Sequence, residues 1–174
     1  MLKKKISSAL AIGLCLLAVL FSFAPSTRAA QAKQSEEAAA INAFKTFVKY
    51  AQTQDGRAWN YFTAESQNLF VKMGVDAAMS DPDMNALLQK EGMSRQDLMQ
   101  LIKIELANPN SEMAKACWVE VSKYFPTEDV SNVKMTAVVS GNKAIIRGPG
   151  SATSLTMIKE NGQWKVDAFS IMEQ

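Results

Sequence analysis

The chain has 174 residues, with 19 Lys and Arg against 17 Asp and Glu, two cysteines and no histidine. The lack of histidine excludes Ser-His-Asp and Cys-His catalytic arrangements and removes the commonest ligand of zinc, copper and iron. Only carboxylates, Lys and Tyr remain for acid–base chemistry, and any metal site would need oxygen ligands.

The N-terminus has the pattern of a secretory signal. Lys3, Lys4 and Lys5 stand before a long apolar run, and the small residues Ala29 and Ala30 follow it. This pattern predicts a signal peptide over residues 1–29, cleaved after Ala29, then a polar leader over 30–34. The expected location is extracytoplasmic, either periplasmic or secreted. Because the run approaches the roughly 20 residues of a membrane span, an uncleaved N-terminal anchor is the alternative, and the only membrane contact expected.

Removal of residues 1–29 would change the charge of the chain. Four of the 19 basic residues lie there, which leaves 15 basic against 17 acidic groups. No basic block remains, so nucleic acid is not an expected partner. Cys117 would be the only cysteine left, which excludes a disulfide within the mature chain and predicts a buried, inert thiol.

One segment begins like a calcium-binding loop, with oxygen-bearing residues at alternate positions from Asp81. It has Ala86 where the loop requires Gly, and Gly92 where a bidentate Glu belongs. A helix start explains the segment better, with Asp81 as the cap and Pro82 in the first turn. We therefore predict no metal and no cofactor.

Residues 35–125 have a helical period throughout. In the third helix, for example, Leu69, Phe70, Met73 and Ala77 are expected to share a buried face. Five helices are each expected to begin after a residue that can cap its N-terminus: Ser35, Thr63, Asp81, Ser94 and Ser111. A further short helix is expected around Trp59 and Phe62.

The period changes to two within residues 130–172, which predicts four strands near 133–140, 143–147, 155–160 and 164–169. Short turns join them, and Asn161–Gly162 is the clearest hairpin signal. Helices followed by a meander predict one α+β domain over residues 35–174, with the helices packed on a curled antiparallel sheet. The second face of the sheet also contains apolar residues, namely Ile145, Ile158, Phe169 and Ile171. This face therefore needs cover as well, which a homodimer would supply.

Two stretches, residues 39–59 and 157–167, resemble the nuclear transport factor two-like superfamily, a cone-shaped α+β fold that includes SnoaL-like and lumazine-binding-like groups. The first is an opening helix that ends in Asp-Gly-Arg-Ala-Trp, and the second is a Glu-Asn-Gly-Gln-Trp-Lys-Val hairpin. Residues 80–109 depart from that pattern by adding helices.

The resemblance implies a small-ligand pocket, a dehydratase or isomerase site, or a scaffold. Asp167 is the candidate base, although a carboxylate at a strand edge, paired with Lys165 or solvent, is the simpler interpretation. Aromatic residues with polar tips are candidates to line a ligand cavity, or else belong to the core: Tyr50, Trp59, Tyr61, Trp118 and Tyr124.

These observations favour an exported, non-enzymatic domain that binds a small apolar ligand, a peptide or an envelope protein. One alternative is a dehydratase or isomerase with Asp167 as base and a Tyr as proton donor. The other is a structural homodimer that covers the second face of the sheet.

Overall fold

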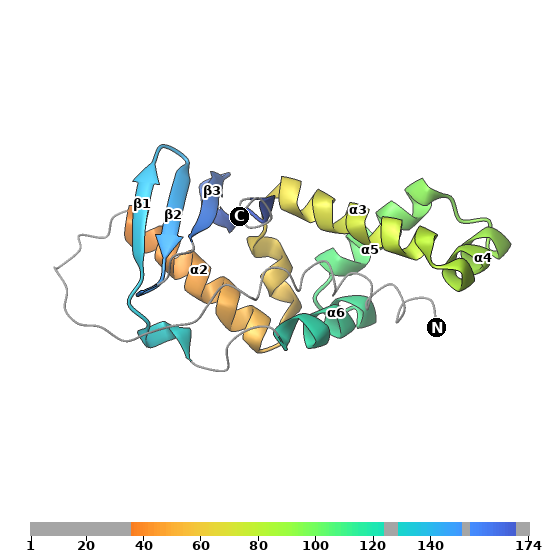
Figure 1. The fold of residues 1–174 in the computed structure, drawn as a ribbon, viewed down its shortest axis with the longest axis horizontal. Coiled ribbons are helices and arrows are strands. Elements are labelled where there is room, and N and C mark those ends of the chain that lie inside the picture. The colour runs from red at the N-terminus through yellow and green to blue at the C-terminus, as the bar shows by residue number, and fades with distance from the viewer. Residues whose placement is uncertain (1–35, 124–128, 151–153, 170–174) are drawn as a thin grey trace.

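The computed structural model describes residues 36–123, 129–150 and 154–169 (Figure 1). Helices come first and a four-stranded antiparallel sheet follows, so the predicted α+β class is confirmed. The predicted signal peptide (1–29), the leader (30–34), Tyr124 and Ile171 lie outside the described residues.

The helical part contains five α-helices and two 3₁₀ turns within the described residues. Their bounds are α2 Glu36–Gln52, η1 Gly56–Tyr61, α3 Ala64–Ser80, α4 Pro82–Lys90, α5 Arg95–Ala107, α6 Glu112–Ser122 and η2 Val130–Asn132. The predicted caps of α3 to α6 are confirmed, because each cap side chain accepts hydrogen bonds from backbone N–H groups of the first turn. Ser94 and Asp97 form a reciprocal capping box at α5.

The sheet is a meander in the order β1, β2, β3, β4, with every neighbouring pair antiparallel. The strands are β1 Thr136–Ser140, β2 Lys143–Arg147, β3 Leu155–Glu160 and β4 Gln163–Val166. Gly141, Asn161 and Gly162 have positive φ in the two tight turns. β4 is shorter than expected because Asp167 begins a turn, in which its carboxylate accepts a hydrogen bond from the backbone N–H of Phe169.

Helix α2 lies across one face of the sheet (Figure 1). Its buried side chains include Phe44, Phe47 and Val48, and the sheet contributes Met157 and Val166 to the same core. The opposite face has partial cover among the described residues, since Val138 is 64% exposed while Ile145 and Ile158 are half-buried. Ile145 and Ile158 therefore lie on this second face as predicted, whereas Phe169 follows the end of β4 and is not part of the sheet.

An aromatic cluster joins this α2 and sheet layer to the remaining helices. The Phe62 ring, fully buried after η1, lies 5.1 Å from the Phe47 ring and 5.0 Å from the Phe70 ring, centroid to centroid. Trp59 stacks edge-on to Phe62 at 6.0 Å. Each such pair contributes about 0.5–1.5 kcal/mol beyond burial, so Phe62 is the packing centre between α2 and α3.

Hydrogen bonds attach the start of α3 to the last strand. The backbone N–H of Thr63 donates to the Val166 carbonyl over 3.0 Å, and that of Ala168 donates to the Ser66 hydroxyl over 2.8 Å. Ser66 also accepts from the Thr63 hydroxyl. These buried polar groups are satisfied by one another, which fixes β4 beside η1 and α3.

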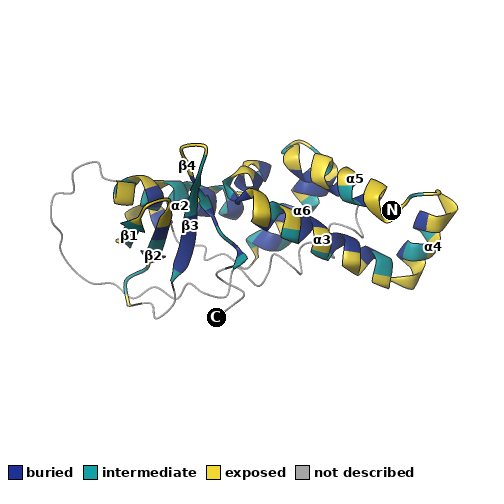
Figure 2. Cartoon of the chain, turned by 90° about the horizontal axis from the view of Figure 1, so that it is seen from above, coloured by how far each residue is buried: buried dark blue, intermediate teal, exposed yellow. Residues whose placement is uncertain are grey.

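The molecule is elongated, with the sheet and α2 at one end and α4 at the other (Figures 1 and 2). Helices α4 and α5, which lie within residues 80–109, therefore extend away from the sheet (Figure 1). One predicted helix face is wrong in part: in α3, Ala77 is exposed, while Val75 and Ala78 are buried. The face is turned because α3 packs against both α4 and α5.

Candidate functional site

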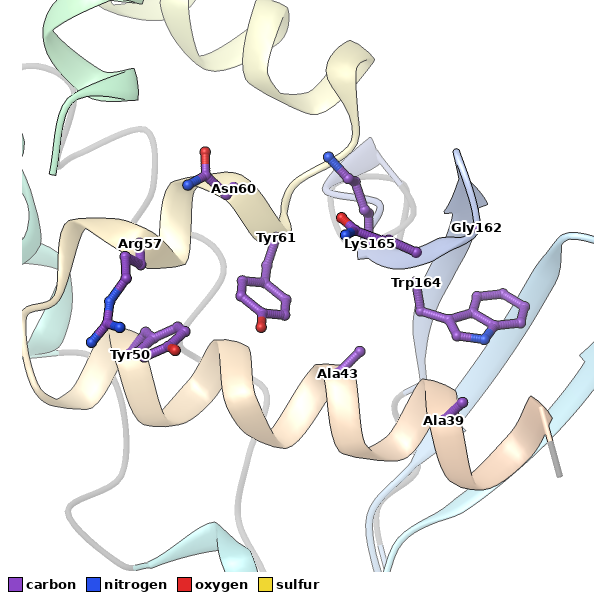
Figure 3. A pocket seen from close by; sticks show the side chains of 10 residues that line it. Ala39, Ala43, Tyr50, Arg57, Asn60, Tyr61, Gly162, Trp164 and Lys165 are labelled. Atoms are coloured by element: carbon purple, nitrogen blue, oxygen red, sulfur yellow. The ribbon is translucent and has the colours of Figure 1, made fainter. Parts of the chain in front are cut away.

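A groove of about 500 Å³ lies between α2, η1 and the β3–β4 hairpin (Figure 3). Ala39 and Ala43 form its floor, one turn apart on the same face of α2. Their side chains end at Cβ, so they leave the space that a longer residue would fill. The opening of this groove thus depends on two small residues in an otherwise well-packed helix.

One end of the groove is an aromatic and cationic cluster. The Tyr50 and Tyr61 ring centroids are 5.7 Å apart, and the Arg57 guanidinium carbon lies 4.5 Å from the Tyr50 ring centroid. Asp55 caps η1 and accepts from Nε and Nη2 of Arg57 over 2.5–3.0 Å. These hydrogen bonds lower the pKa of Asp55 and raise the pKa of Arg57, so both stay charged.

Tyr61 occupies the middle of the groove, and its side chain points toward α2 (Figure 3). Burial raises the pKa of its hydroxyl, and nearby Tyr50 raises it further. The opposing effects of Arg57 and of a hydrogen bond with Thr46 are smaller. Tyr61 therefore keeps its phenolic proton at physiological pH.

The β4 end of the groove contains Trp164 and Lys165. Trp164 is 5% exposed, and its indole N–H donates to Glu36 over 3.0 Å, while Lys159 Nζ binds the other oxygen of Glu36 at 2.7 Å. The hydrogen bonds from Lys159 and Trp164 lower the pKa of Glu36. The indole is thus held in a fixed orientation by Glu36.

Asn60, Gln163 and Lys165 also line the groove. None of the three side chains has a protein partner within the described residues. Because β4 is the last strand of the sheet, side chains from both of its faces reach the groove along its edge. The groove therefore combines fixed aromatic walls with polar groups that are available to a ligand.

The structure separates the predicted aromatic site residues. Tyr50 and Tyr61 line the groove, whereas Trp59 and Trp118 are 2% and 1% exposed and belong to the core. Tyr124 lies outside the described residues. Of the four candidates within the described residues, two thus line the groove and two belong to the core.

Asp167, the candidate base, does not line the groove. It follows β4, is half-buried, and binds the backbone N–H of Phe169 over 3.1 Å. This is the bond of a turn-forming aspartate. The position of Asp167 is thus explained by its turn, and its role as a base stays a prediction.

Sequence reasoning did not select Arg57, Asn60, Gln163 or Lys165 as site residues. Arg57, Gln163 and Lys165 lie in the two stretches that carry the family resemblance, directly beside a turn and a hairpin. The available signal was thus the polar residues that flank an Asp-Gly and an Asn-Gly turn, since loops next to rigid elements often hold binding groups.

Within residues 36–123, 129–150 and 154–169, no group of three or more acidic or Cys side chains is placed to hold a metal ion. In the same residues, none of the helices has both the length and the apolar character to cross a bilayer. Comparison with family models, with curated proteins and with solved structures found no match to this chain. The superfamily resemblance therefore stays a prediction.

Proposed function

We propose that this protein is an exported, non-enzymatic binding domain that holds a small molecule in the groove between α2, η1 and β4. The observation that supports this most is the makeup of the groove. Its volume of about 500 Å³ falls within the range of small-molecule sites, and it combines aromatic walls with convergent polar groups. The N-terminal pattern of residues 1–29 supports export.

The walls are preorganised, which favours binding. Trp164 is held by Glu36, and Tyr61 is half-buried between Tyr50 and α2. Side chains that are already ordered lose little conformational entropy when a ligand arrives. A ligand would therefore gain contact with the aromatic faces at a small entropic cost.

The polar lining favours an amphipathic ligand over a purely apolar one. Asn60, Gln163 and Lys165 have no protein partner in the described residues, and a purely apolar ligand would leave them without hydrogen bonds when it displaced water. The flat part of the ligand would contact the rings, and its polar part would contact these three side chains.

The groove also favours binding over catalysis. No Asp, Glu or Cys lines it, and Tyr61 is neutral because burial raises its pKa. The candidate base Asp167 is outside the lining. A dehydratase or isomerase needs a base within hydrogen-bond reach of the substrate proton, and these walls supply no carboxylate or thiolate for that role and only one amine, that of Lys165.

The test is native mass spectrometry of protein isolated after expression of the full chain. Ala43→Leu would fill the floor of the groove, while Ala77→Leu makes the same chemical change at an exposed position of α3. We expect the wild type and Ala77→Leu to retain a small molecule that Ala43→Leu lacks, with unchanged far-UV circular dichroism in all three. Equal retention by Ala43→Leu, or none by any variant, would overturn the proposal.

A further inference from the structure

The charges that line the groove are all positive. Arg57 and Lys165 contribute them, and no carboxylate is present among the lining residues. Resting on the proposed function, we infer that the ligand is a small carboxylate with a flat aromatic body, and that Lys165 binds its negative charge.

Two acidic residues that contact lining residues already have partners. Asp55 accepts three contacts from Nε and Nη2 of Arg57, and this ion pair offsets the charge of the guanidinium. Glu36 is bound by Lys159 and by the indole N–H of Trp164. Lys165 is therefore the groove cation with no ion-pair partner in the described residues.

The sheet around Lys165 leaves its charge available. Across the strands it pairs with Ile158 on β3, an apolar neighbour. Glu160 lies diagonally on the same face of the sheet, but its carboxylate accepts from the backbone N–H of Ala64, at the start of α3, over 3.2 Å. Asp167, two residues further along, binds the Phe169 N–H. Both acids have other partners, and Lys165 reaches the groove.

The half-buried position of Lys165 strengthens a bond to an anion. Fully exposed ion pairs contribute little because water screens them, whereas a charge-assisted hydrogen bond to a half-buried amine is less screened. The same walls suit a flat body, since the Tyr50, Tyr61 and Trp164 side chains line the groove over an alanine floor.

A cationic ligand fits these observations less well. Aromatic side chains can bind cations through their ring faces, but the Arg57 guanidinium already lies 4.5 Å from the Tyr50 ring centroid. That ring face is therefore occupied, and a cationic ligand elsewhere in the groove would meet the charge of Lys165, with no carboxylate among the lining residues to bind it.

The test uses three molecules of nearly equal size that differ in charge: indole-3-acetate, indole-3-acetamide and tryptamine. Their affinities for protein from the full chain are measured by isothermal titration calorimetry. We expect the acetate to bind about tenfold more tightly than the amide, which one charge-assisted hydrogen bond supplies, and tryptamine to bind most weakly.

Three variants assign the effect to Lys165. Lys165→Met keeps the apolar stem of the side chain and should abolish the preference for indole-3-acetate without weakening the binding of indole-3-acetamide. Lys165→Arg should retain that preference. Lys90→Met, on the distant helix α4, should change none of the affinities. Equal affinity for all three probes, or a preference that survives in Lys165→Met, would overturn the inference while the proposed binding function stands. The inference would also be overturned if none of the three probes bound. In that case, native mass spectrometry would decide the proposed function separately, by comparing the small molecule retained by the wild type with that retained by Ala43→Leu.

Discussion

Gly56 offers the sharpest test of how η1 is positioned. It is buried at the start of η1, and a Cβ atom added there would lie 2.6 Å from the Cα and 2.9 Å from the Cβ of Pro109. Carbon atoms in contact normally lie about 3.5–4.0 Å apart. Gly56→Ala would thus require a shift of roughly 1 Å, and the nearest atom belongs to the backbone, which cannot rotate away.

The expected cost follows from two opposing effects. Overpacking a well-packed site costs about 1–3 kcal/mol, and a contact with backbone belongs in the upper part of that range. Replacing glycine with alanine also lowers the conformational entropy of the unfolded chain, which raises the free energy of unfolding by about 0.4–1 kcal/mol. We therefore expect Gly56→Ala to lower the free energy of unfolding by about 2 kcal/mol, a large part of the ~5–15 kcal/mol of an ordinary domain.

Gly141→Ala is the matched control. A Cβ there meets nothing within 4 Å, but φ is +59°, so its cost is backbone strain alone. Urea unfolding followed by tryptophan fluorescence reports the stability of both variants. Only Gly56→Ala should also weaken ligand binding, because it displaces the turn that holds Arg57 and Tyr61. An unchanged urea midpoint for Gly56→Ala would refute this account of the packing.

Three further measurements test the charges and the N-terminus. Glu36→Gln should lower the melting temperature at pH 7: Lys159 and Trp164 lower the pKa of Glu36, so its stabilisation is complete above about pH 4.5 and is lost as the pH falls through the lower folded pKa. A difference between wild type and Glu36→Gln that does not shrink as the pH is lowered below 4.5 would contradict this. When tyrosine ionisation is followed by absorbance at 295 nm, the part of the signal that Tyr61→Phe removes should have its midpoint above pH 10. The stability that the neutral phenol of Tyr61 contributes should be lost as the pH rises beyond that value. A midpoint at or below pH 10 would refute the burial of the hydroxyl. N-terminal sequencing of the exported protein should begin at Ala30, and a chain that begins at Met1 in the membrane fraction would support the anchor instead.

The sequence predicted helices and strands well where a local interaction specifies them. Asp81 followed by Pro82, and Ser94 followed by Asp97, identify helix starts because each cap satisfies N–H groups within the next three residues. The Asn161–Gly162 turn likewise identifies the β3–β4 hairpin. Such signals lie within a few residues and do not depend on the rest of the fold.

Helix faces and strand ends were less predictable. In α3, the predicted face included Ala77, but the buried face is turned toward Val75 and Ala78. A helix with apolar residues on much of its circumference has several acceptable faces, and the helices it packs against select one. β4 similarly ends early because Asp167 binds the backbone two residues on.

The site depended most on tertiary structure. Trp59 and Tyr61 are two residues apart in η1, yet Trp59 is in the core and Tyr61 lines the groove, which residue type alone does not distinguish. By itself the sequence determined where the local elements begin, that no imidazole is available, and which chemistry is thereby excluded. Only the packing of α2, η1 and β4 decided that Tyr50 and Lys165 share a groove, because residues so far apart in the chain meet through burial of non-local surfaces that no local pattern encodes.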